Sequence, residues 1–178
     1  MLERRRGLPI LLSALTIAVA ERIGVPIVGV GLPGHFIVAD RSRREPRYLD
    51  PFDGWAELTE ERCGEMVRSI AGVDLVPHHL EPVGVPATAR RMLLNLRGAY
   101  LRRRSLADAL WTVELSAIVD PDNPGVRVEH RALLIGLGRY DEAERSAIEE
   151  LADDPSSDSR RRIDEQLGAI AELRLRMN

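Results

Sequence analysis

Two residues of the sequence have the types and the placement that nucleophilic catalysis uses. His35 opens an apolar stretch, HFIVA, and Asp50 closes the next strand-like stretch, RYLD. A carboxylate that orients an imidazole is two thirds of a nucleophilic triad, in which the imidazole removes a proton from a serine or a cysteine. The same two residues also fit a structural pair, in which a half-buried histidine and an aspartate only satisfy each other's hydrogen bonds.

The nucleophile of such a triad has few candidates in this chain. Cys63 is the one cysteine, which excludes an internal disulfide and a cysteine zinc cluster. Its segment, TEERCGEM, is also explained by the first turns of a helix, and cysteine often packs as a small buried hydrophobic residue. Ser13, in an apolar run, is a second candidate. Order along the chain does not exclude either, because unrelated enzymes permute their triads.

The elements that would position these residues follow from the sequence pattern. An antiparallel hairpin of the stretches around His35 and Asp50 places the start of one strand beside the end of the next, so the two side chains become neighbours. Gly-Leu-Pro-Gly and the charged turn DRSRREP separate the strands, and Thr59 suits the N-cap of the following helix. The predicted strands are residues 25–30, 35–39 and 47–49, and the predicted helices are residues 9–22 and 59–70.

The first 24 residues allow two interpretations. A basic start, an apolar run from Leu8 to Ala20 and an Ala18-Val19-Ala20 end have the layout of a secretory signal peptide. The run is too short to span a membrane. It also fits a buried helix that begins near Pro9 and is apolar nearly all round. The pattern alone does not decide between them.

The second half of the chain is predicted to be helical and repetitive. Residues 74–86 carry three prolines and little periodicity, so a linker is placed at 77–85. Beyond it, equivalent residues recur 34 positions apart, the period of tetratricopeptide repeats, which are stacked pairs of antiparallel helices. Residues 158–177 would form a capping helix. The pairs at this spacing are Leu106 and Tyr140, Ala109 and Ala143, and Pro121 and Pro155.

Other motifs argue against a cofactor, a metal or a nucleic acid. GVGLPG, residues 29–34, satisfies G-x-G-x-x-G, but the strand-like HFIV follows it, whereas a dinucleotide site needs a helix there. Adjacent His78 and His79 point apart, and DPFDG lacks the ligand spacing of a calcium loop. The net charge is −3, all 25 basic residues are arginine, and acidic residues lie near each arginine run. Solvated faces are favoured for the runs at 4–6, 102–104 and 160–162.

The motifs RRRGLPI, GVGLPGHF and DPFDG, in this order, and the later CGEM and RRMLLNLRGAY resemble the bacterial SirB-like transglutaminase-core family. The resemblance implies an α+β fold: a papain-like, transglutaminase-like domain at residues 1–76, followed by tetratricopeptide-like helices at 86–178. It also favours the buried helix over the signal peptide. Because family members carry a further N-terminal helical segment, the chain is expected to be a short-start form.

In active members of this family the nucleophilic cysteine opens the central helix, and the resemblance places that position near Ile10, between Pro9 and Leu11. An aliphatic side chain cannot ionise or attack a carbonyl. The resemblance thus carries the histidine and the aspartate of the triad over to His35 and Asp50, and replaces its nucleophile with an aliphatic residue.

The leading hypothesis is a non-catalytic, cytoplasmic interaction or regulatory module that binds a protein or peptide through its helical repeats. It would use no cofactor, metal, nucleic acid or membrane. The alternative is an acyl transferase or an amide or isopeptide hydrolase that uses His35 and Asp50, with Cys63, Ser13 or an activated water as nucleophile. A third hypothesis is an assembly protein whose repeats form oligomers.

Overall fold

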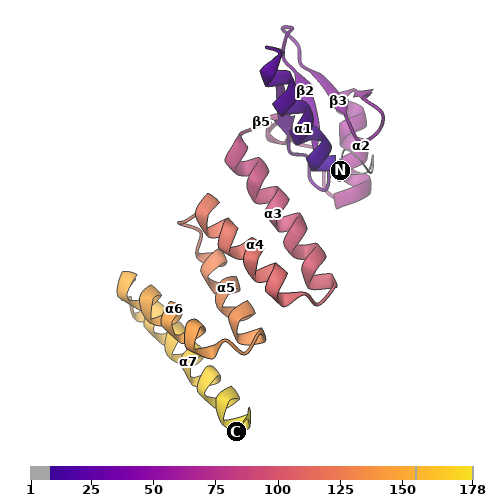
Figure 1. The fold of residues 1–178 in the computed structure, drawn as a ribbon. Helices are drawn as coiled ribbons and strands as arrows, with labels where there is room; N and C mark the ends of the chain where they lie inside the picture. Colours follow the sequence, from indigo (N-terminus) through magenta and orange to yellow (C-terminus); the bar gives the residue numbers. More distant parts are fainter. Residues whose placement is uncertain (1–8, 155, 178) are drawn as a thin grey trace. The chain divides into compact units, whose positions relative to one another are not determined.

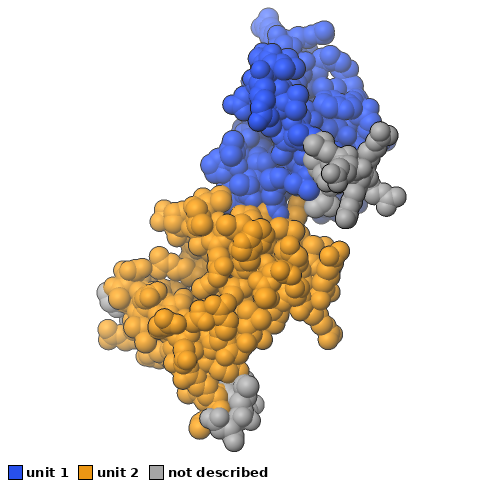
Figure 2. Space-filling model, in the orientation of Figure 1, with its two compact units in different colours: residues 1–92 blue, residues 93–178 orange. Residues whose placement is uncertain are grey.

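A small antiparallel sheet with helices packed on it occupies the first half of the chain, and helices make up the second half (Figure 1). The structure is a computed structural model and describes residues 9–154 and 156–177. Seven α-helices and one five-stranded sheet lie within these residues, which confirms the α+β class. The chain divides into two compact units, residues 1–92 and 93–178, called here the first and the second unit (Figure 2).

The sheet of the first unit has the strand order β4-β3-β2-β1-β5, and every neighbouring pair is antiparallel. The three strands predicted from the sequence are present, and two short edge strands, β4 and β5, were not predicted. The elements are α1 (Pro9–Arg22), β1 (Ile27–Val30), β2 (Ile37–Asp40), β3 (Arg47–Asp50), β4 (Ala56–Leu58), α2 (Glu60–Ala71), the 3₁₀ helix η1 (Pro77–Leu80), β5 (Pro82–Val83) and α3 (Val85–Arg102), which continues into the second unit.

Helix α1 packs against β1 and β2, as expected for the buried-helix interpretation of the N-terminal run. Ile10, Ser13 and Ala20, spaced three and seven residues apart, are its buried residues. The basic residues Arg4–Arg6, which belong to the signal-peptide layout, lie outside the described residues. Within the described part of the chain, no helix combines the length and the apolar character that crossing a membrane requires.

Helix α2 also packs on the sheet, and apolar residues of the helix and the sheet form a core between them. Its N-cap is Thr59, as predicted, since the Thr59 hydroxyl accepts a hydrogen bond from the Arg62 backbone N–H at 3.1 Å. The helix ends at Gly72, whose φ of 68° closes the last turn. Because strand side chains alternate between the two faces, every second residue of β2 faces this core. The core residues are Val30, Leu32, Ile37, Ala39, Tyr48, Leu58, Cys63 and Val67.

The second unit is a run of helices in which each packs against the next: α4 with α5, α5 with α6, and α6 with α7. Ala109 and Ala143, the small residues of the 34-residue pattern, are fully buried. Helix α4 ends just before Pro121, whereas Pro155 lies outside the described residues. A helical region is therefore confirmed, and its identity as tetratricopeptide repeats stays a prediction. The helices are α4 (Leu106–Val119), α5 (Pro124–Gly136), α6 (Tyr140–Asp153) and α7 (Ser157–Met177).

The division between the two units falls within α3, after Met92. The sequence analysis placed a linker at 77–85, where prolines interrupt the pattern. In the structure these residues form η1 and β5, and β5 pairs with β1 through Gly29 and Val83. Prolines are tolerated there because an edge strand leaves one side of its backbone unpaired.

A buried ionic network joins three helices of the second unit. Arg131 of α5 is 2% exposed and donates to Glu150 of α6, while its Nε donates to Gln166 of α7 at 3.0 Å. Arg162 of α7 also donates to Glu150, at 2.6 Å. One carboxylate therefore compensates two guanidinium groups, one of which is out of reach of water.

We expect Glu150→Ala to lower the free energy of unfolding by about 3 kcal/mol, because it leaves the buried Arg131 charge uncompensated. Urea denaturation followed by circular dichroism measures the change. Glu149→Ala is the matched control, since Glu149 is the exposed neighbour on the same helix, and its cost should stay below about 0.5 kcal/mol. Equal costs for the two variants would contradict the assignment of the network as a stabilising element.

Gly34, which precedes His35, is the glycine most constrained by its surroundings. Its φ is 77°, and an added β-carbon would lie 2.4 Å from Cγ2 of Ile70 in α2. We expect Gly34→Ala to destabilise the chain by about 2–3 kcal/mol, from left-handed strain and overpacking together. Gly72→Ala, at a φ of 68° with open space around it, should cost only about 1 kcal/mol. Chemical denaturation of both variants tests this order, and the reverse order would contradict it.

Candidate functional site

The pairing of β2 with β3 brings His35 and Asp50 together, as the hairpin argument predicted. Val38 pairs with Leu49 and Ala39 with Tyr48, so the start of β2 lies beside the end of β3. Nε2 of His35 lies 2.7 Å from Oδ2 of Asp50. In a neutral imidazole, a hydrogen bond from Nε2 to the carboxylate places the proton on Nε2 and leaves the lone pair on Nδ1. Nδ1 is therefore the nitrogen that can act as a base.

The turn that follows Asp50 holds both its side chain and its backbone carbonyl by hydrogen bonds. Its side chain is 2% exposed, and its second oxygen, Oδ1, accepts a hydrogen bond from the Phe52 backbone N–H at 2.9 Å. The Asp50 carbonyl accepts from the Trp55 backbone N–H, also at 2.9 Å. The DPFDG motif is thus a turn that holds one carboxylate in place, and no calcium loop is needed to explain it.

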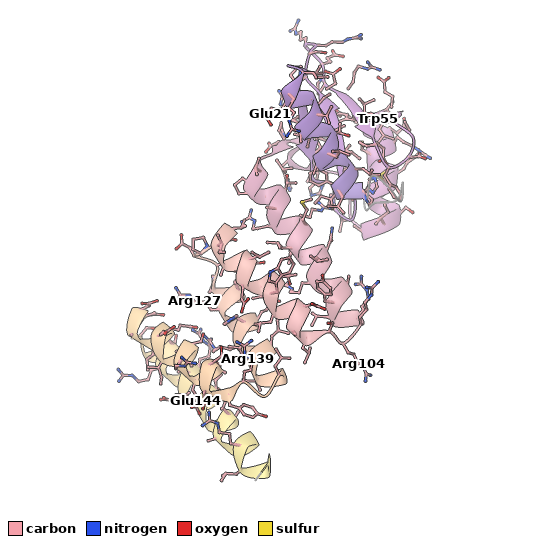
Figure 3. All side chains as sticks on the ribbon, viewed as in Figure 1. Glu21, Trp55, Arg104, Arg127, Arg139 and Glu144 are labelled. Atoms are coloured by element: carbon pink, nitrogen blue, oxygen red, sulfur yellow. The ribbon has the colours of Figure 1, made fainter. Side chains whose placement is uncertain are left out.

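The same turn presents two aromatic rings to solvent. Phe52 is 54% and Trp55 is 52% exposed. Trp55 is labelled in the first unit in Figure 3. The Phe52 ring meets the His35 imidazole edge to face, with 6.3 Å between the ring centroids. Trp55 has a φ of 68°, an unusual conformation for a bulky residue. Exposed aromatic surface thus adjoins the histidine–aspartate pair.

His35 is also held through its backbone, by a residue that the sequence analysis did not single out. Arg91, on α3, donates from Nη2 to the carbonyl oxygens of Leu32 and His35, at 2.6 and 2.8 Å. Its guanidinium carbon lies 5.7 Å from the centroid of the Phe36 ring, and burial lowers the pKa of the guanidinium. The motif RRMLLNLRGAY contains Arg91, but an arginine in a helical segment carries no signal of a contact 56 residues away.

Helix α1 directs its first turn towards the His35 end of the sheet. The Ser13 hydroxyl donates to the Phe36 carbonyl oxygen at 3.2 Å. One turn later, Cδ1 of Ile17 lies 3.3 Å from where a β-carbon on Gly29 would stand, and Gly29 pairs with Val38. Helix α1 therefore advances in the direction of β2. From this direction we infer that Ile10, one turn before Ser13, lies towards the end of the sheet that carries His35. Ile10 is 2% exposed.

The two candidate nucleophiles are engaged elsewhere. Ser13 is fully buried, and its hydroxyl hydrogen is used in the bond to Phe36. Cys63 is fully buried in the apolar core, and its thiol forms no hydrogen bond with His35 among the described residues. Burial, with smaller effects of the Glu60 and Asp50 carboxylates, raises the pKa of the Cys63 thiol to about 11. Such a thiol stays protonated near neutral pH and is a poor nucleophile.

Three sequence motifs that were not favoured as ligand sites can now be compared with the structure. Gly34 of GVGLPG leads into β2, and no helix begins there, so the motif lacks the helix N-terminus of a dinucleotide site. His78 and His79 lie in η1 with their ring centroids 4.3 Å apart, so the expectation that the two side chains point apart is wrong. No group of three or more potential ligands among the described residues could hold a metal ion. In the arginine run at 160–162, Arg161 pairs with Asp158 and Arg162 with Glu150.

Among the described residues, His35 and Asp50 have the geometry of a base and its orienting carboxylate, and neither candidate nucleophile is hydrogen-bonded to that base. The Nδ1 lone pair of His35 can accept a proton, and Asp50 stabilises the imidazolium that results. A triad needs a serine or cysteine within hydrogen-bond reach of that nitrogen. Neither Ser13 nor Cys63 donates to His35 in the described part of the structure.

The chain is similar to one family model and to several bacterial proteins. Residues 1–94 match the family model described as Transglutaminase-like superfamily. The chain is 30% identical over 130 residues to a UPF0162 protein of Vibrio cholerae, a match that covers 70% of this chain and 47% of that protein. It is 29% identical over 177 residues to UPF0162 protein PA3419 of Pseudomonas aeruginosa, covering 96% of this chain and 63% of the relative.

A mouse protein matches about half of the chain. Mouse F-box only protein 21 is 42% identical over 104 residues, which are 54% of this chain and 16% of the mouse protein. No solved structure matches the chain. The chain spans about half the length of the Vibrio relative, 47%, and less of a Xylella fastidiosa relative, 37%. Because the family model covers more than half of its residues and includes His35 and Asp50, the chain belongs to the transglutaminase-like superfamily.

Proposed function

We propose that this chain is a non-catalytic transglutaminase-like protein that binds segments of other proteins and does not cleave or modify them. The observation that carries the proposal is the combination of an intact base with no nucleophile. His35 and Asp50 are hydrogen-bonded at 2.7 Å, while Cys63 is buried with a thiol pKa raised to about 11. Ile10 stands where the family resemblance places the nucleophile.

The surroundings of His35 suit an extended peptide. The histidine side chain is 11% exposed, and the neighbouring Phe52 and Trp55 rings are about half exposed. Aromatic surface beside a few fixed polar groups is typical of binding sites, because the rings supply apolar contact and the polar groups set the orientation. A peptide lying there would meet a proton acceptor and apolar rings.

The second unit supports a role in binding. We interpret its helices as tetratricopeptide-like pairs, on the basis of the 34-residue spacing and of the buried Ala109 and Ala143. Stacks of such pairs bind peptide segments along their concave side. The match to a small part of mouse F-box only protein 21 also suits a module, since there the shared segment makes up 16% of a longer protein.

The alternative function is that of an enzyme, an acyl transferase or an amide or isopeptide hydrolase. The intact His35–Asp50 bond favours it, because Asp50 is 2% exposed and orients the imidazole as a general base requires. With Ser13 and Cys63 engaged, the nucleophile would be a water molecule activated by Nδ1. Turnover of an amide or isopeptide substrate that disappears in His35→Ala would establish this alternative.

A cysteine placed at the lost position should regain the chemistry of a thiol beside an imidazole. We expect the Ile10→Cys thiol to react with iodoacetamide near neutral pH, because His35 lowers its pKa to below about 7.5. The smaller cysteine also leaves room for the reagent. Mass spectrometry of the labelled chain measures the rate, which should fall at least tenfold in Ile10→Cys/His35→Ala.

Pro9→Cys and Leu11→Cys bracket the position and serve as matched variants, because both residues are half buried on the same turn. A thiol at one of the three positions should depend on His35. Wild-type chain and His35→Ala should show equal, background hydrolysis of amide substrates. If none of the three thiols responds to the loss of His35, the proposed origin of the site as a triad without its nucleophile is wrong.

Cys63 predicts a dependence of stability on alkaline pH. Its thiol pKa is raised from 9.0 to about 11 in the folded chain, so the unfolded chain loses the proton first. This contribution to stability is complete below about pH 9 and is lost as the pH rises to about 11, by about 2.7 kcal/mol in total. The free energy of unfolding of wild type and of Cys63→Ala, measured across this pH range, isolates the contribution of the thiol, because all other groups titrate in both proteins. Identical pH profiles would contradict the burial of the thiol.

A further inference from the structure

The turn that carries His35 is closed by a single guanidinium. Both hydrogen bonds from Arg91 come from one nitrogen, Nη2, and end on the carbonyl oxygens of Leu32 and His35. The His35 backbone N–H itself donates to the Leu32 carbonyl at 3.1 Å. The first and last residues of the turn are thus joined to each other and to the same side chain, across Gly34 with its φ of 77°.

Arg91 forms no ion pair with a carboxylate among the described residues. Its charge is partly buried, and its partners are two neutral carbonyl groups and the face of the Phe36 ring, 5.7 Å from the guanidinium carbon. Removing a guanidinium from water without a counter-ion is unfavourable, which burial expresses as a lowered pKa. The backbone of the histidine turn therefore provides most of what compensates this charge.

The space around Arg91 fits a planar side chain. Nη1 lies 3.4 Å from where a β-carbon on Gly31 would stand, so the backbone at this glycine passes close to the guanidinium. Arginine offers several N–H donors in one plane and stacks on aromatic rings, whereas a lysine ammonium is a compact and strongly hydrated charge. A lysine at this position would not reproduce both the bridge and the contact with Phe36.

We propose that Arg91 is the positioning residue of the site, which holds the His35 backbone so that Nε2 stays on Asp50 and Nδ1 faces the position of the lost nucleophile. This inference deepens the proposed function, because it rests on the same His35–Asp50 pair. It assigns a site role to a residue on α3, beyond the last strand at Val83. The family match, which extends to residue 94, includes Arg91.

The test uses the full chain and the nitrogen resonances of His35. In wild type, a long-range ¹H–¹⁵N spectrum should show His35 in the single tautomer that carries its proton on Nε2. Arg91→Met keeps the aliphatic stem and removes the donors. We expect it to mix the two tautomers and to raise the hydrogen-exchange rate of the His35 amide at least tenfold. Arg91→Lys should restore less than half of the change.

The control is Arg44→Met, which removes an exposed arginine of the same unit, far along the β2–β3 turn from His35. Its His35 spectrum should match that of wild type. Circular dichroism confirms that each variant is folded at the temperature of the measurement. If Arg91→Met does not fold, Arg91→Lys carries the test, because it keeps the charge and loses the planar bridge.

A wild-type His35 spectrum in folded Arg91→Met, or in Arg91→Lys where only that variant folds, overturns the inference. A lowered melting temperature with unchanged His35 resonances would assign Arg91 a purely structural role and also overturns it. In the Ile10→Cys background, Arg91→Met should slow alkylation at least tenfold and Arg44→Met should not. Failure of Ile10→Cys itself would count against the proposed function and leave the spectral test of Arg91 intact.

Discussion

The pairing of β2 with β3 is the constraint on which the site depends. It places a buried carboxylate, Asp50, where it accepts hydrogen bonds from the side chain of His35 and from a backbone N–H of its own turn. A carboxylate that is 2% exposed must have its hydrogen bonds satisfied within the protein. A shift of one residue in the strand register would turn Asp50 to the opposite face of the sheet. The strand register and the histidine–aspartate bond therefore stabilise each other.

The role of the His35 imidazole depends on whether a nucleophile stands beside it. An oriented imidazole lowers a reaction barrier only when a positioned group gives up its proton in the transition state. Without that group, the same imidazole is a fixed hydrogen-bonding partner, and the rings of Phe52 and Trp55 beside it are a surface for apolar contact. The energy of those contacts then contributes to affinity. Binding is thus the function that we propose for this arrangement.

Much of the first unit could be predicted from the sequence, because its main signals are local. The turns Gly-Leu-Pro-Gly and DRSRREP separated the three central strands, and an apolar run after Pro9 indicated α1. The hairpin rule then placed His35 beside Asp50. Strands β4 and β5, of three and two residues, were missed because segments so short carry no periodicity. Their pairing comes from contacts with strands that are distant in sequence.

The role of Arg91 lies beyond sequence reasoning for a different reason. Its partners are backbone carbonyl groups, which every residue has, so no pattern of side chains marks them. Arg91 also lies beyond residues 77–85, where the linker was predicted. A segment that follows the last strand of a sheet can still contribute contacts that the sheet requires. Here the last strand ends at Val83, and Arg91, eight residues later on α3, donates hydrogen bonds to the turn that contains His35. The compact unit therefore extends past the last strand into α3, and its end at Met92 includes Arg91.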